Sequence, residues 1–137
     1  VCPTHAARNG WDTGAQKMQE KMAEYLAGFA QNKKGKIGYL NFIMNVSPAC
    51  DCYGHADNPI VPDLGICGSL DPVAIDAASN DLVMQAGGNK DSVLKKALKP
   101  GSDKFRDIYP EVDWAWQLEH AEKLGLGSRK YELVKVE

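Results

Sequence analysis

Residues 36–46 have the sequence KIGYLNFIMNV, which is apolar on both of the faces that a β-strand presents. Strands covered on both sides, as in an α/β sheet, have this pattern, whereas a strand with one face in water alternates apolar and polar residues. We therefore predict that residues 36–46 form a buried central strand. The segments on either side of it indicate what covers it.

The segment before this strand has a helical pattern. Over residues 14–31, apolar side chains recur at spacings of three and four, which predicts a helix with an apolar face. The residues of that face are Met18, Met22, Leu26 and Phe29.

A second helix is predicted to begin at Pro72 and to run to about residue 85. A proline at the first helical position costs no hydrogen bond, and either Ser69 or Asp71 is the expected N-cap. The remaining patterns predict a short helix, a single helical turn, a longer helix and a final strand. These lie over residues 91–98, 104–109, 112–124 and 130–136.

The alternation of helices and strands indicates an α/β fold, with a small mixed sheet flanked by helices. Because two strands make a thin sheet, we expect it to be part of a larger domain. Either a third strand lies near Ile60 and Val61 or within residues 64–67, or the upstream part of the same polypeptide supplies the neighbours. The chain begins at Val1 without an initiator methionine, so we expect it to have been cut from a longer protein.

Composition bounds the class of protein. The chain has 137 residues, 44% hydrophobic and 25% charged, which is enough for one globular domain. The formal net charge of −2 gives no global attraction to nucleic acid or to an anionic membrane, and we expect neither as a partner. No apolar stretch reaches the length of about 18 residues that a membrane-spanning helix needs.

Residues 47–68 form a long connection that contains the strongest chemical signal in the chain. Cys50, Cys52, His55 and Asp57 lie within eight residues of one another. Thiolate and imidazole ligands suit zinc or iron, so these four residues are a candidate metal site, with Cys50 and Cys52 as its core. The apolar residues that follow are expected to anchor the connection as an ordered loop.

Other interpretations of this loop remain open. The thiols could be buried and inert, since unpaired cysteine is among the most buried residue types. They could form a redox dithiol, although their acidic neighbours disfavour a low thiol pKa. Asp51 and Asp57 could serve only to cap turns. Cys67, between small and apolar neighbours, is expected to be a core thiol. This use of cysteine is typical of a reducing compartment, so we expect a cytoplasmic protein.

Several segments together carry a family resemblance. These are residues 45–52 (NVSPACDC), 57–66 (DNPIVPDLGI), 69–76 (SLDPVAID), 116–122 (WQLEHAE) and 124–129 (LGLGSR). With them the chain resembles the Fe–S centre proteins that carry the domain of unknown function 362, over nearly its whole length. In addition, bacterial ferredoxin motifs end in Cys-Pro, as Cys2-Pro3 does here.

The resemblance implies an α/β domain interrupted by a ferredoxin-like insert with two 4Fe-4S motifs. Residues 1–12 would be the tail end of that ferredoxin-type module, and residues 13–137 the C-terminal α/β domain. Cys2 would then bind a 4Fe-4S cluster in the intact protein only, because a lone cysteine cannot hold a cluster in this segment.

Two functions follow as expectations. The first is a fragment of a cytoplasmic iron–sulfur protein linked to redox chemistry or electron transfer, with the upstream polypeptide and a redox partner as its partners. The alternative is a metal- or ligand-binding module that uses the Cys50/Cys52 loop without catalysis. Whether the protein is an enzyme is left open by the sequence.

Overall fold

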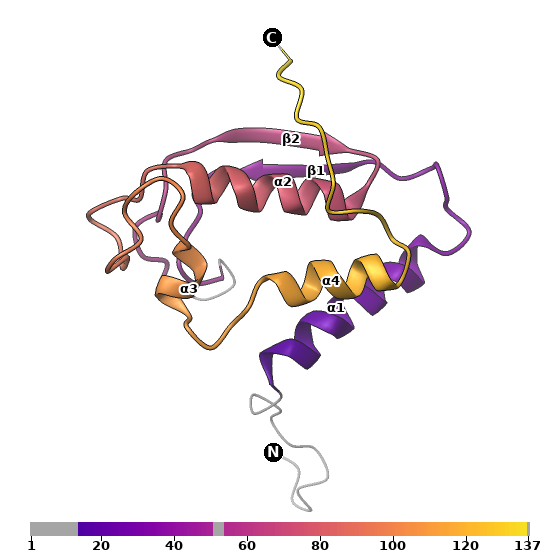
Figure 1. Cartoon of the computed structure of the whole chain (residues 1–137), viewed down its shortest axis with the longest axis horizontal. Coiled ribbons are helices and arrows are strands. Elements are labelled where there is room, and N and C mark those ends of the chain that lie inside the picture. Colours follow the sequence, from indigo (N-terminus) through magenta and orange to yellow (C-terminus); the bar gives the residue numbers. More distant parts are fainter. Residues whose placement is uncertain (1–13, 51–53, 137) are drawn as a thin grey trace, which may run out of the picture.

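The computed structural model describes residues 14–50 and 54–136. In this part of the chain, four helices accompany two strands, and the expected α/β class is confirmed (Figure 1). The elements are, in order, α1 (Ala15–Ala30), β1 (Tyr39–Ile43), β2 (Gly65–Ser69), α2 (Pro72–Gln85), α3 (Lys104–Ile108) and α4 (Ala115–Lys123). None of the helices in these ranges is long and apolar enough to cross a membrane.

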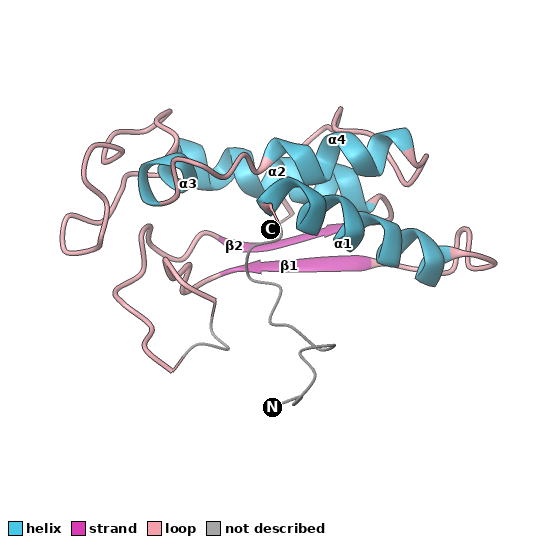
Figure 2. Cartoon of the chain, turned by 90° about the horizontal axis from the view of Figure 1, so that it is seen from below, coloured by secondary structure: helices cyan, strands magenta, loops and turns pink. Residues whose placement is uncertain are grey.

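The two strands form an antiparallel ladder in which Asn41 pairs with Cys67 and Phe42 with Ile66. Helix α2 packs on one face of this ladder, as Figure 2 shows. Because successive side chains of a strand point to opposite faces, Tyr39, Asn41 and Ile43 share the face that α2 covers. This geometry places the single polar residue of β1 against a helix.

The prediction of a buried central strand over residues 36–46 was wrong. Strand β1 is shorter, and on the face turned away from α2 the side chains of Leu40, Phe42 and Ile66 are 66%, 63% and 59% exposed. The reason is physical: a continuous apolar run shows that both faces favour burial, but it does not show that both covering layers are present. Within the described residues, only one is.

The first of two core clusters lies beyond the end of β1. It joins Ile43, Ile60 and Val61 to Val83 near the C-terminal end of α2. The backbone amide of Ile60 donates to the Val46 carbonyl at 2.8 Å, and that of Leu64 donates to the Ile43 carbonyl at 2.9 Å. The expectation that apolar residues anchor the connection after β1 is thus confirmed for residues 60 and 61, and the strand suspected near residues 64–67 is β2.

The second core cluster joins α1, α2 and α4. Its buried members are Ala23, Val73, Ala77, Leu118 and Ala121. Three of them are alanines, whose small side chains let the helices approach closely, and α1 and α4 lie side by side (Figure 1). As a result, the apolar residues Met18, Met22 and Phe29 of α1 are about half exposed rather than part of this core.

Two further sequence predictions were wrong. Residues 91–98 form turns instead of a short helix, because the carboxylate of Asp107 accepts the backbone N–H groups of Lys95, Lys96 and Ala97. Residues 130–136 form no strand; they are an exposed segment that is attached at Tyr131 to Asp81 of α2 and then leaves the body of the molecule (Figure 1). Their alternating pattern suits a strand, but no described strand pairs with them.

The predicted start of α2 at Pro72 is confirmed. Asp71 is the N-cap, and its Oδ1 accepts the backbone N–H groups of Val73 and Ala74 at 2.8 and 2.9 Å. At the other end of α2, the fully buried Lys104 donates from Nζ to the Met84 carbonyl at 2.9 Å. Burial lowers the pKa of Lys104, and the neighbouring Asp103 partly opposes that shift.

Candidate functional site

The main cleft of the described chain is lined by residues from all four helices and from β1, or next to these elements. It has a volume of about 1030 Å³ and is lined by residues of α1, β1, α2 and α4 and of the segment from α3 to the start of α4. That volume is at the upper end of the range for small-molecule sites, which are mostly apolar with a few placed polar groups.

Three polar side chains form one hydrogen-bonded group in the lining of this cleft. Asn41 Nδ2 donates to Asp76 Oδ1 at 2.8 Å and to Ser79 Oγ at 3.0 Å. Ser79 Oγ in turn donates to the Ile75 carbonyl at 2.7 Å. Asp76 and Ser79 lie three residues apart, so they share the face of α2 that meets β1. We call Asn41, Asp76 and Ser79 the polar group.

The polar group is held by the fold rather than by a local motif. All three side chains are half-buried, and Asn41 reaches α2 because it points from β1 to the face that this helix covers. The partner of Asp76 is therefore a residue of the strand, Asn41.

Aromatic residues form another wall of the main cleft. They are Phe105, Tyr109 and Trp114, from the segment that includes α3 and the start of α4. Tyr109 Oη donates to the Pro48 carbonyl at 2.8 Å, and Trp114 Nε1 donates to Asp103 Oδ2 at 3.2 Å. Because Tyr109 Oη and Trp114 Nε1 already donate hydrogen bonds to residues outside the polar group, the rings contribute mainly apolar surface to the cleft. Met18 and Met22 of α1 add further apolar lining.

The bond from Tyr109 also fixes the position of the cysteine-bearing loop. It attaches the loop at Pro48, two residues before Cys50, to a residue that lines the main cleft. Cys50 is exposed. The start of this loop therefore lies at the rim of the main cleft.

The predicted metal ligands are only partly within the described residues. Cys2 and Cys52 lie outside them. His55 and Asp57 are exposed, and Asp57 Oδ1 accepts the backbone N–H of the next residue, Asn58, at 2.7 Å. Residues 14–50 and 54–136 contain no group of three or more His, Cys, Asp or Glu side chains placed to hold a metal ion. The four-residue set stays a prediction.

The described residues supply only some of the ligands that an iron–sulfur cluster needs. A 4Fe-4S cluster takes four cysteine thiolates, and of the four cysteines in the chain the structure describes Cys50 and Cys67. Cys67 is partly buried and packs against the first core cluster, in agreement with its expected role as a core thiol. This part of the chain does not fit a cluster by itself.

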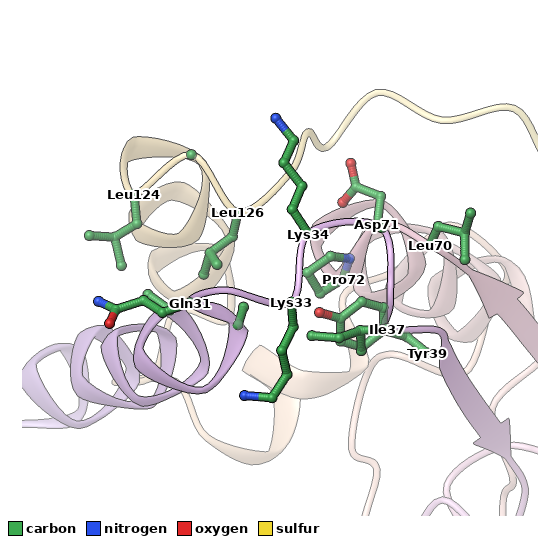
Figure 3. A pocket seen from close by; sticks show the side chains of 14 residues that line it. Gln31, Lys33, Lys34, Ile37, Tyr39, Leu70, Asp71, Pro72, Leu124 and Leu126 are labelled. Atoms are coloured by element: carbon green, nitrogen blue, oxygen red, sulfur yellow. The ribbon is translucent and has the colours of Figure 1, made fainter.

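A second cleft, of about 650 Å³, lies between the end of α1 and the start of α2 (Figure 3). Its basic residues, Lys33 and Lys34, point in opposite directions in Figure 3. Lys33 Nζ donates to the Phe29 carbonyl at 2.6 Å and lies 4.4 Å from the centre of the Phe29 ring. Asp71 already occupies the N-terminus of α2. The second cleft therefore lacks the converging charges of an anion site.

The polar group of the main cleft was not predicted from the sequence. Asn41 gave a usable signal, because an amide in the middle of the apolar run YLNFI needs a hydrogen-bonding partner once it is buried. The partners of Asn41 could not be found from a local sequence pattern, because Asp76 and Ser79 are 35 and 38 residues away along the chain. Trp114 lies within residues 112–124, for which the sequence predicted only a helix.

Comparison with known proteins adds one finding. A family model, Domain of unknown function (DUF362), matches residues 2–81. The match includes β1, β2 and the polar group, and it ends before the aromatic wall. No curated protein and no solved structure matches the chain.

Proposed function

The chain belongs to the DUF362 family, and from this premise we propose that it is a module that binds a small organic ligand in the main cleft, beside the cysteine-bearing loop. The observation that carries the proposal is the polar group, which is held by fixed hydrogen bonds within an otherwise largely apolar cleft. A few placed polar groups in apolar surroundings orient a ligand and give specificity.

The rim of the cleft supports a link between ligand binding and the cysteines. Tyr109 lines the main cleft and holds the loop at Pro48. A ligand that contacts the Tyr109 ring would therefore lie near the start of the Cys50/Cys52 loop. We propose that zinc or iron binds this loop through Cys50 and Cys52, with His55 and Asp57 as the further ligands.

The test of ligand binding is a variant that fills the cleft. Asn80 lines the main cleft on α2, whereas Gln85 is exposed on the same helix and does not line it. Ligand-observed NMR with a library of small aromatic compounds should detect binders of the unmodified chain. Asn80→Phe should abolish their signals and the matched control Gln85→Phe should keep them. Binding that survives Asn80→Phe unchanged would contradict the proposal.

The metal proposal has its own measurement. Zinc titration followed by elemental analysis should give bound metal that is lost in Cys50→Ser and in Cys52→Ser. Cys67→Ala is the control, because Cys67 packs against the first core cluster rather than in the loop. Equal metal content in all three variants would reject the loop as the site.

A second candidate function is the iron–sulfur role. Its support is the ferredoxin-like Cys2-Pro3 pair, together with the family resemblance of residues 45–76. We propose that the intact protein is a cytoplasmic 4Fe-4S protein, linked to redox chemistry or electron transfer, in which Cys2 is a cluster ligand. The exposed apolar face of the sheet, with Leu40 and Phe42, supports the upstream polypeptide as a partner.

Anaerobic expression of the protein with its upstream region tests this second candidate. Iron and acid-labile sulfide should be present, and Cys2→Ser should lower both, whereas Cys67→Ala should not. A protein that contains neither element when it is prepared without oxygen would reject the iron–sulfur role.

A further inference from the structure

We infer that the ligand of the main cleft is an organic cation, an ammonium group on an aromatic or apolar body; this inference rests on the proposed function and names its ligand class. It is based on the charge of the lining, on the acceptor atoms of the polar group, and on the aromatic wall.

The lining has one sign of charge. Among the described residues that line the main cleft, Asp76 is the only charged one. Within residues 14–50 and 54–136, no lysine, arginine or histidine contributes to the lining. A phosphate or carboxylate group entering the cleft would meet a carboxylate with no opposing positive charge, which costs free energy in a half-buried site. A cation is the charge that this lining accepts.

The polar group also has two oxygen atoms that accept no hydrogen bond within the described residues. Asn41 Nδ2 uses its two protons on Asp76 Oδ1 and Ser79 Oγ. Within the described residues, no hydrogen bond to Asp76 Oδ2 or to Asn41 Oδ1 is found. These two oxygens belong to side chains that are already held together, so their geometry is fixed before a ligand arrives. An ammonium group carries three donors and no acceptor, and it therefore matches a pair of oxygen acceptors.

The aromatic wall favours the same class. Cations are attracted to the faces of tryptophan, tyrosine and phenylalanine rings, and the same rings bury an apolar body. Trp114 and Tyr109 are anchored through their polar atoms to Asp103 and Pro48, which holds the two rings in place. The thioethers of Met18 and Met22 add an adaptable apolar surface for the rest of the ligand.

Three probes of nearly equal shape separate charge from shape. They are 2-phenylethylamine, which is an ammonium ion at pH 7, 2-phenylethanol, which is neutral, and phenylacetate, which is an anion. Isothermal titration calorimetry with the full chain should give an affinity for the amine about tenfold higher than for the alcohol, because a charge-assisted hydrogen bond to Asp76 is added. Phenylacetate should bind most weakly of the three.

Asp76→Asn should reduce the affinity for the amine to that for the alcohol and leave the affinity for the alcohol unchanged. Asp81→Asn is the matched control, because it removes the same charge from the same helix at a residue outside the lining. This variant should not change the preference for the amine.

The outcomes are distinguishable. If none of the three probes binds the unmodified chain, the proposed function itself fails. If the alcohol binds as tightly as the amine, or if Asp76→Asn leaves the preference for the amine intact, the cation inference fails while ligand binding stands. The comparison of the three probes needs only the unmodified chain, so it decides between charge and shape even if Asp76→Asn does not fold.

Discussion

Asp71 and Gly127 lie in such close contact that a Cβ atom added at Gly127 would overlap the carboxylate of Asp71. That carboxylate accepts the backbone N–H groups of Val73 and Ala74 through Oδ1 and the backbone N–H of Ser128 through Oδ2. One side chain thus caps α2 and also fixes the segment that follows α4. The contact requires glycine for its space, since no unusual backbone angle is found at Gly127.

Gly127→Ala should destabilise the protein by about 1–3 kcal/mol, because the added methyl group must displace the cap or shift the chain. Gly87→Ala is the matched control, because nothing lies within 4 Å of its added Cβ atom. Urea unfolding of the two variants measures the difference. Equal stabilities would mean that the segment after α4 can move away at little cost.

Asp71→Ala should lower the free energy of unfolding by about 0.5–2 kcal/mol, the usual cost of losing an N-cap. Ser69→Ala should cost less, because within the described residues Ser69 Oγ makes a single hydrogen bond, accepted from the backbone N–H of Asp71 at 3.0 Å. Thermal melting of both variants gives the ranking. A larger loss for Ser69→Ala than for Asp71→Ala would assign the principal role to Ser69.

The start of α2 was predictable because its signals are local. Asp71 and Pro72 specify a cap and a first helical residue through interactions within one turn. The loop cysteines were found through residue type alone. In contrast, residues 91–98 have a helical composition, yet the backbone amides of residues 95–97 are bound by Asp107, which lies 10 to 12 residues further along the chain.

The main cleft could not be predicted from the sequence, because it also depends on contacts between residues that are far apart along the chain. Its polar group brings Asn41 of β1 to Asp76 and Ser79 of α2, and it depends on which face of β1 the helix covers. A strand with apolar residues on both faces does not specify that choice. The same ambiguity led to the wrong prediction of a fully buried strand.

Acid should weaken the turn at residues 95–97. Backbone hydrogen bonds, those from Lys96 and Ala97 foremost, hold the pKa of Asp107 below its ordinary value. A carboxyl group whose pKa is lower in the folded state stabilises the fold above its unfolded pKa of 3.8, and that stabilisation is lost as the pH falls through the folded value. The stability difference between the unmodified chain and Asp107→Asn should therefore shrink below about pH 4. A constant difference from pH 7 down to pH 2 would contradict this.

Tyr131 should lose its phenolic proton at a higher pH than an ordinary tyrosine. Its Oη donates to Asp81 Oδ2 at 2.6 Å, and this bond, with burial and the charge of Asp81, raises the pKa of Tyr131 to about 12. Absorbance at 295 nm should follow this titration, and Asp81→Asn should bring the pKa back toward 10. Because the folded pKa is the higher one, the stabilisation is complete below the unfolded pKa of 10 and is lost as the pH rises toward 12.

The direction of this pH dependence can be checked by comparing the free energy of unfolding of the unmodified chain with that of Tyr131→Phe. The unmodified chain should hold its advantage at pH 9 and lose it by pH 12. An advantage that grew with pH would show that the tyrosinate, rather than the phenol, is the form favoured by the fold.

The most direct test of the central claim, that the main cleft binds a ligand, is amide chemical-shift mapping of the full chain during titration with 2-phenylethylamine. The predicted result is a saturable shift of the amides of Asn41 and Ser79 and of the indole N–H of Trp114, which line the main cleft from β1, α2 and the N-cap of α4. Shifts confined to Lys34, Ile37 and Leu70 of the second cleft, or no saturable shifts at all, would contradict the account.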